Sequence, residues 1–225
     1  MRSMVIPHFL FAVVGVLFGF ATNALAGPPL ICHAIEIGQA KSLPPIDWNS
    51  SATGGYDLKS LSRDTLAILD SNSSVLVRME TLRRATIYAR HDPEAAKQLL
   101  LKLRARADHS EAAGHPDALS WFDVGYLAEA YQQWIGKSDA NPAAGLDGYA
   151  WIRRAIRLRG EDPEMEFAAA LVTLNGPESA HREHVYKAIA GTGSDALLAQ
   201  NLASRFYRQT VSEVLSQPTS KGAVR

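Results

Sequence analysis

Apolar residues recur along most of this chain with the period of a helix. From Leu58 onward they return every three or four positions with charged residues between them, and no stretch of useful length alternates apolar and polar residues. This pattern predicts an all-α fold. The expected helices cover residues 58–69, 74–90, 93–108, 116–135, 147–159, 163–174, 177–190 and 194–215.

The segment 116–134 is apolar on nearly every side of the helix it predicts. Leu119, Phe122 and Tyr126 form one row at helical spacing, and charges occur only at three positions, which are Asp117, Asp123 and Glu129. Such a helix must be covered on more than one side. The segment therefore predicts a stack of helices with neighbours packed before and after it.

Four expected helices begin beside a proline followed by an acidic residue. Asp92 can cap free backbone N–H groups, Pro93 lacks only a donor that is not needed there, and Glu94 meets the positive end of the helix dipole. The same proline and acid pair recurs at Pro116-Asp117, Pro163-Glu164 and Pro177-Glu178. These pairs divide the chain into helical units.

Residues 1–26 have the three parts of an export signal. Arg2 is followed by an apolar run over 9–21 and by Ala24-Leu25-Ala26, a small-residue cleavage site. The run is shorter than the roughly 20 residues that span a bilayer. We expect cleavage after Ala26, a periplasmic or secreted protein, and no membrane span after cleavage; the alternative is an uncleaved N-terminal anchor.

Residues 27–57 are rich in proline, glycine, serine and asparagine, and they show no sustained helical period. Proline favours extended backbone, so this stretch predicts an extended arm and linker. Its apolar residues, such as Ile35 and Leu43, predict that part of the arm lies along the helical body. The expected organisation is a signal peptide at 1–26, the arm at 27–57, a helical repeat domain at 58–215 and a disordered tail at 216–225. Two glycosylation sequons, at Asn49 and Asn72, matter only in a glycosylating host.

The region 114–169 resembles the tetratricopeptide and Sel1-like class of helical repeats over about one and a half repeats. The resemblance rests on Pro116-Asp117-Ala118, Val124-Gly125-Tyr126-Leu127, Trp151-Ile152-Arg153-Arg154-Ala155-Ile156, Gly160 and Asp162-Pro163-Glu164. It implies antiparallel helix pairs stacked as a right-handed solenoid. Two departures are the loop 136–145, which is long for that class, and Ile152, where an aromatic residue is usual. The arm, with Gly27-Pro28-Pro29 and Cys32-His33, resembles the mature N-termini of uncharacterised exported bacterial proteins, which implies no activity.

Charge argues against a general nucleic-acid binder, because 23 basic and 23 acidic residues balance to a formal net charge of zero. Basic residues nevertheless outnumber acidic ones over 78–106. We interpret this local excess as a solvated face or as a docking surface for acidic envelope polymers or protein tails. The later helix expected over 147–159 is also rich in basic residues, with Arg153, Arg154, Arg157 and Arg159.

Candidate metal ligands are few. The single cysteine excludes an internal disulfide, and Cys32-His33 lacks the further ligands that a zinc site requires. His181 and His184 lie three residues apart and form at most one edge of a metal site. We expect both histidines to be exposed to solvent.

Two functions from different classes remain open. The first is an exported binding or scaffold module without catalytic activity or cofactor, whose concave side receives a protein or peptide. Its contacts are expected among the exposed members of a set that could instead be core, namely Arg83, Tyr88, Trp121, Asp123 and Tyr126. The alternative is a metal- or thiol-dependent protein that combines Cys32 and His33 with His181 and His184.

Overall fold

The computed structural model describes residues 29–50, 53–135 and 141–206, and all regular structure in these ranges is helical. A 3-10 helix, η1 (Leu58–Ser60), precedes eight α-helices. These are α1 (Leu61–Ser71), α2 (Val75–Ala89), α3 (Pro93–Ala112), α4 (Ala118–Trp134), α5 (Gly148–Arg159), α6 (Pro163–Val172), α7 (Glu178–Gly191) and α8 (Ala196–Phe206). The all-α prediction is confirmed for this part of the chain. The expected signal peptide and tail lie outside the described residues.

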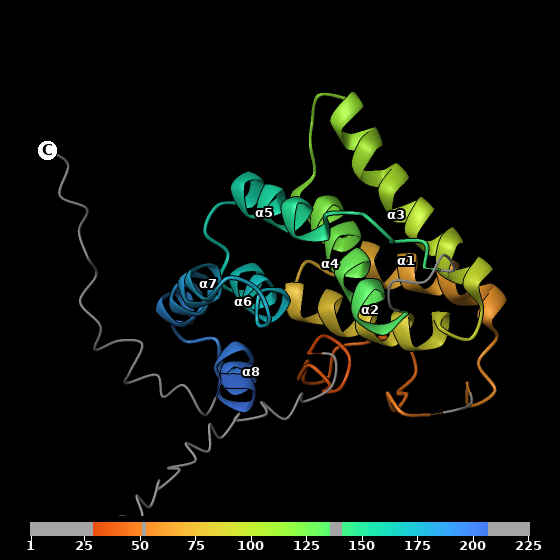
Figure 1. Cartoon of the computed structure of the whole chain (residues 1–225), viewed down its shortest axis with the longest axis horizontal. Coiled ribbons are helices and arrows are strands. Elements are labelled where there is room, and N and C mark those ends of the chain that lie inside the picture. The colour runs from red at the N-terminus through yellow and green to blue at the C-terminus, as the bar shows by residue number, and fades with distance from the viewer. Residues whose placement is uncertain (1–28, 51–52, 136–140, 207–225) are drawn as a thin grey trace, which may run out of the picture.

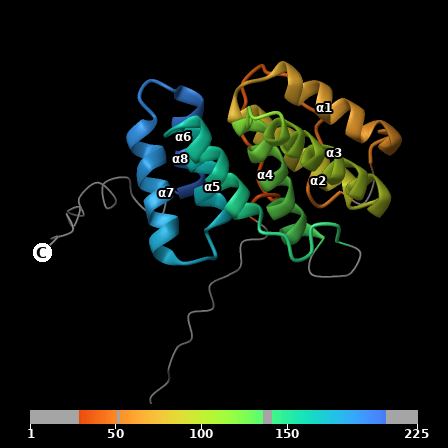
Figure 2. The same cartoon turned by 90° about the horizontal axis from the view of Figure 1, so that it is seen from above.

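The helices form two groups that meet along α4 (Figures 1 and 2). Figure 2 shows α1 to α4 on one side and α5 to α8 on the other. Helix α4 packs against α2, α3 and α5, while α6 packs mainly against α7 and also touches α2 and α4. In the three described ranges, no helix is long and apolar enough to cross a membrane.

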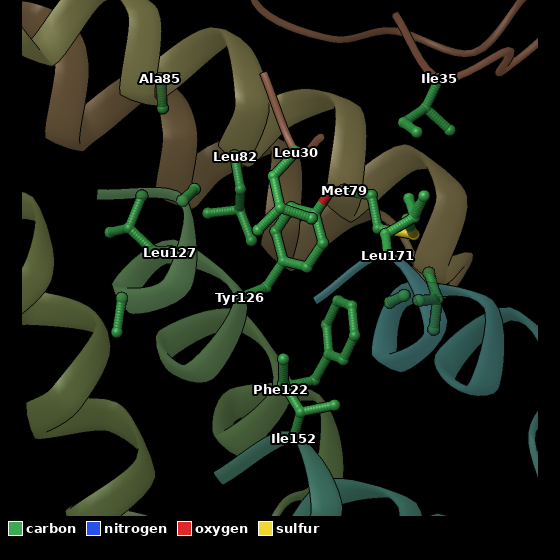
Figure 3. Packing of buried hydrophobic residues seen from close by; sticks show 14 of the residues in the cluster. Leu30, Ile35, Met79, Leu82, Ala85, Phe122, Tyr126, Leu127, Ile152 and Leu171 are labelled. Atoms are coloured by element: carbon green, nitrogen blue, oxygen red, sulfur yellow. The ribbon is translucent and has the colours of Figure 1, made fainter. Parts of the chain in front are cut away.

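Helix α4 is buried on nearly every side, as its composition predicts. Phe122, Tyr126 and Tyr131 are among the largest fully buried side chains, and the rings of Phe122 and Tyr126 stack with centroids 5.7 Å apart. Figure 3 shows these two rings inside the core, with Leu82 of α2 and Ile152 of α5 nearby. The core therefore lies around α4.

Helix starts follow the predicted chemistry at two of the four proline and acid pairs. The side chains of Asp92 and Asp162 accept hydrogen bonds from the backbone N–H groups that open α3 and α6, with proline at the first helical position. At α4 the acid itself, Asp117, is the cap and the proline precedes it. Helix α7 begins after Pro177 without a side-chain cap.

Two glycines allow α4 and α5 to approach closely. A Cβ atom on Gly125 would lie 2.8 Å from the carbonyl oxygen of Gly148, and one on Gly148 would lie 2.5 Å from that of Gly125. Both distances are below van der Waals contact with backbone atoms that cannot move without moving a helix. The absence of a side chain at Gly125 and Gly148 is therefore required for this helix packing.

Helix α2 is enclosed although it carries several charges. Arg78 and Arg83 are buried, so the expected solvated basic face is wrong at these positions. Arg78 Nη1 donates to Asp123 Oδ2 of α4 at 2.5 Å, and its Nη2 donates to the carbonyl oxygens of Leu69 and Asn72 at 2.6 Å. A buried ion is tolerated where such partners replace water.

Residues 29–57 contain no helix or strand in their described part, yet several of their apolar side chains are buried. These are Leu30, Ile31, Ile35, Ile37 and Leu43. Their backbone pairs with charges of α2. Glu80 Oε2 accepts the N–H of Ile35 at 2.8 Å, Arg83 Nη1 donates to the carbonyl of Ile31 at 2.8 Å, and Arg84 donates to the carbonyl of Leu43.

The same N-terminal segment also holds α8. Glu36 and Asn201 exchange two hydrogen bonds of 2.9 Å between the backbone of one and the side-chain amide of the other. Arg205 Nη2 donates to the carbonyl of His33 at 2.6 Å. Residues 29–50 therefore connect α2 with the last described helix.

A side chain of α6, distant in sequence, caps the N-terminus of α2. Ser74 makes no side-chain cap, and Glu164 Oε2 instead accepts the N–H groups of Val75 at 2.5 Å and Leu76 at 3.1 Å. A carboxylate is stabilised at the positive end of a helix dipole. Glu164 thus ties the second group of helices to the first.

We predict that Gly125→Ala destabilises the protein by about 1 to 3 kcal/mol, because the new methyl group forces α4 and α5 apart. Helix propensity alone would favour alanine by about 1 kcal/mol. Urea denaturation measures the change. Ala105→Gly, at an exposed position of α3, measures the propensity term alone, and a stabilised Gly125→Ala variant would contradict the prediction.

We predict that Glu80→Ala lowers the free energy of unfolding by about 3 to 5 kcal/mol, because Arg83 is then buried without its carboxylate. Loss of the Ile35 contact should also speed proteolytic cleavage within residues 29–50. Urea denaturation and limited proteolysis with mass spectrometry test both effects. Glu178→Ala, whose side chain is 81% exposed, is the control and should change stability by less than about 0.5 kcal/mol.

Candidate functional site

The five residues considered as binding contacts all lie in the interior. Arg83, Tyr88, Trp121, Asp123 and Tyr126 are at most 6% exposed. The core interpretation is confirmed for Trp121 and Tyr126, whereas a role for the set as exposed contacts is wrong. Arg83 and Asp123 balance buried charges, and burial raises the pKa of Asp123 despite the Arg78 guanidinium beside it.

The residues of the metal alternative are not assembled. Cys32 is partly buried, which raises the pKa of its thiol, and His33 is exposed with its imidazole pKa lowered by partial burial and by Arg205 and Arg83. Over residues 29–50, 53–135 and 141–206, no three histidine, cysteine, aspartate or glutamate side chains are placed to share a metal ion.

The expected exposure of the two α7 histidines is wrong. His181 is 4% exposed and His184 is 8% exposed. His181 Nδ1 bonds to the carbonyl of Ala170 at 2.9 Å, and its ring lies edge-on to Phe206 at 5.6 Å. Both imidazoles turn toward α6, because α6 and α7 pack along their lengths.

His184 is the centre of a hydrogen-bonded chain of three side chains. Its Nδ1 lies 2.5 Å from Glu166 Oε2 of α6, and its Nε2 lies 2.7 Å from the Tyr149 hydroxyl of α5. Glu166 is 1% exposed, whereas Tyr149 is only partly buried. The chain therefore runs from a buried carboxylate outward to a phenol.

Local structure explains how the three side chains meet. Glu166 lies in the first turn of α6, between the buried Met165 and Phe167 and before a wholly apolar run, so it is carried into the core with these neighbours. Tyr149 is the second residue of α5, where its backbone N–H donates to Glu129 Oε1 of α4 at 2.8 Å. The close packing of α4 on α5 thus sets the position of the phenol.

The Tyr149 side chain lines a cleft between α5, α6 and α7. The cleft has a volume of about 560 Å³ and is named the α5–α7 cleft below. Its lining comprises Tyr149, Arg153, Ile156, Arg157, Glu166, Pro177, Ser179, Ala180, Glu183, His184 and Lys187. A second cleft, of about 630 Å³, lies at the start of α3, and no series of buried, hydrogen-bonded polar side chains is among the described residues that line it.

Two arginines of the α5–α7 cleft make no short ion pair within the part of the chain that the structure describes. Helix α5 carries four arginines, of which Arg154 bonds Glu111 at 2.6 Å and Arg159 bonds Asp162 at 2.6 Å. Arg153 and Arg157 form no ion pair with any described residue, and their i, i+4 spacing puts both on one face of the helix. The cleft therefore offers a positive rim.

The remaining charged side chains of the cleft, two glutamates and one lysine, lie close together. Lys187 Nζ lies 2.7 Å from Glu183 Oε1 and 3.9 Å from Glu166 Oε1. Burial raises the pKa of the Tyr149 phenol, with Glu183 and Glu166 adding to the shift and Arg153 opposing it. The phenol consequently keeps its proton at neutral pH and can act as a hydrogen-bond donor.

The arrangement suits the binding of an oxyanion. Guanidinium groups at the rim supply forked donors, and the phenol supplies a donor or an acceptor at the floor. Sequence reasoning considered His184 but missed Tyr149 and Glu166. The available signal was a glutamate inside the apolar run of 165–172, because a buried acid needs a partner.

We predict that His184→Ala lowers the free energy of unfolding by roughly 3 kcal/mol, because the buried Glu166 carboxylate loses its donor. His184→Asn should cost less than half of this, since its amide nitrogen takes the place of Nδ1. Urea denaturation compares the two variants. His109→Ala, at an exposed position of α3, is the control, and equal losses in His184→Ala and His184→Asn would contradict the role of the Glu166 contact.

Compared with models of known protein families, with curated proteins and with solved structures, the chain has no match.

Proposed function

We propose that this protein is an exported helical binding module that receives an acidic segment of a partner protein in the α5–α7 cleft. The observation that carries the proposal is the pair Arg153 and Arg157, which form no ion pair with a carboxylate of residues 29–50, 53–135 or 141–206 and lie beside a cleft of about 560 Å³. Each guanidinium can donate a pair of hydrogen bonds to one carboxylate. Two such groups one helical turn apart match the carboxylates of an extended acidic segment.

Packing supports a tetratricopeptide-like or Sel1-like stack as the scaffold of this module. Helix α5 packs most extensively on α4, and α7 packs on α6, so these four helices form two consecutive pairs, whereas α2 and α3 make few contacts with each other. In such stacks, binding surfaces lie along the helices that the pairs expose. The α5–α7 cleft joins one pair to the next, and this is where a bound segment would touch both.

An acidic peptide fits the cleft better than an extended anionic polymer. The positive rim is short and belongs to one helix, while Glu183 with an exposed carboxylate lies on the opposite side. Acidic side chains spaced by a peptide backbone can reach the two arginines and avoid Glu183. A polymer with charge at every unit would meet that repulsion.

We predict that a fluorescein-labelled peptide of eight residues that alternates glutamate and serine binds, whereas a glycine-serine peptide of equal length does not. The double variant Arg153→Ala and Arg157→Ala should weaken binding by about tenfold, which corresponds to roughly 0.7 kcal/mol from each partly exposed charge pair. Fluorescence anisotropy measures the affinity, which should also fall as salt concentration rises.

The control variant is Arg63→Ala with Arg182→Ala, two exposed arginines outside the cleft that change the net charge equally. It should bind the peptide as the unaltered protein does. Equal affinity of all three proteins would contradict the proposal. So would tighter binding of a polyuronate than of the peptide, since that would identify a polysaccharide as the partner.

A further inference from the structure

We infer that the α5–α7 cleft binds an oxyanion together with a proton, which is taken up by His184. This inference rests on the proposed function and adds the chemical condition under which the cleft accepts its ligand. It follows from counting the hydrogens on the chain from Glu166 through His184 to Tyr149.

While the His184 imidazole is neutral and Glu166 is ionised, the Tyr149 hydroxyl has no hydrogen to offer a ligand. Glu166 can only accept, so His184 Nδ1 carries the single hydrogen of a neutral imidazole and donates it across 2.5 Å. His184 Nε2 then has only a lone pair. The Tyr149 hydroxyl therefore donates to Nε2 across 2.7 Å and presents its own lone pairs to the cleft. Lone pairs repel an oxyanion.

A proton on Nε2 reverses the second hydrogen bond. The imidazolium donates from both nitrogens, so the Tyr149 oxygen becomes an acceptor and its O–H is released toward the cleft. The phenol can then donate to an oxyanion that the rim arginines hold. No side chain has to change position, because the two heavy-atom distances suit either direction of donation.

The charges around His184 support the protonated state once an anion is present. Glu166 has its second oxygen, Oε1, buried without a hydrogen-bond partner in the described part of the chain, and the Lys187 ammonium, 3.9 Å from it, is beyond hydrogen-bond distance, so this carboxylate still lacks a direct donor at Oε1. A proton on His184 pairs with that carboxylate. The titratable and charged groups that line the cleft together with His184 are Glu166 on α6, Tyr149, Arg153 and Arg157 on α5, and Glu183 and Lys187 on α7.

A bound anion offsets the positive charges that oppose protonation of His184. Arg153, Arg157 and Lys187 oppose a further positive charge on His184, whereas Glu166 and Glu183 favour it. An oxyanion at the rim offsets the two arginines and leaves the two carboxylates to stabilise the imidazolium. Anion binding and proton uptake therefore favour each other, and the coupling is reciprocal.

Sulfate tests the inference, because it stays a dianion between pH 5.5 and pH 8. We predict that the sulfate affinity, measured from amide chemical shifts at constant ionic strength, falls by up to about tenfold per pH unit as the pH rises from 6 to 8, as uptake of one proton requires. His184→Asn should bind sulfate weakly and with no such pH dependence. Tyr149→Phe should weaken sulfate binding severalfold at pH 6, while Tyr186→Phe, at an exposed position of α7, should not.

A second measurement does not depend on the folding of any variant. In the unaltered protein labelled with ¹⁵N-histidine, sulfate added at pH 7 should shift both ring nitrogens of His184 toward their doubly protonated resonances. A sulfate affinity that is equal at pH 6 and pH 8 would overturn the inference, and so would an absence of sulfate binding throughout this range.

The two proposals fail separately. Glutamate-peptide binding that depends on Arg153 and Arg157 but not on pH would leave the binding module standing and remove the proton coupling. Sulfate binding with proton uptake, in a protein that ignores the glutamate peptide, would keep the coupling and remove the acidic protein segment as the ligand.

Discussion

The fold depends on how the charges of α2 are compensated after the helix is buried. Removing Arg78, Glu80 and Arg83 from water is costly unless each finds a partner at once. Arg78 donates to Asp123 of α4 and to backbone carbonyls at the end of α1, while Glu80 accepts from both Arg83 and a backbone N–H of the N-terminal segment. Helix α4, the end of α1 and the N-terminal segment thus each satisfy a specific charge of α2. Misplacing any of them would leave an ion buried and unpaired, so these contacts specify the arrangement more sharply than apolar packing does.

The α5–α7 cleft depends on the same arrangement through two connections. Glu164 caps α2 and so fixes the first turn of α6, and Glu166, two residues further, begins the chain to His184 and Tyr149. On the other side, the contact between Gly125 and Gly148 brings the start of α5 onto α4. Tyr149 and Glu166 therefore approach His184 from helices that are each anchored to the centre of the molecule, which gives the cleft a rigid floor.

Much of the helical organisation could be predicted from the sequence, because local signals specify it. Asp92 and Asp162 cap helices where their spacing indicates, and the apolar surface of α4 predicts its burial. The charges were misread for a physical reason. Apolar periodicity treats every charged residue as exposed, which fails at Arg78 and Arg83, because Asp123 and the carbonyl of Ile31, to which they donate, are distant in sequence. The chain from Glu166 to Tyr149 was missed for the same reason, since its members lie on three helices and no spacing connects them.

Arginines on α5 show how one residue type can serve two purposes. Arg154 and Arg159 have carboxylates within 2.6 Å and fasten α5 to its surroundings. Arg153 and Arg157 have none among the described residues, and like charges at i, i+4 destabilise a helix by about 0.2 to 0.5 kcal/mol. The helix packs through Ile152 and Ala155, which are fully buried, so its core contacts do not require these two cations. A bound anion would reduce the repulsion between these two arginines. The buried Glu166 carboxylate would then form an ion pair with a His184 imidazolium instead of a hydrogen bond with a neutral imidazole. Ligand and proton together therefore satisfy charges that folding alone leaves incompletely matched.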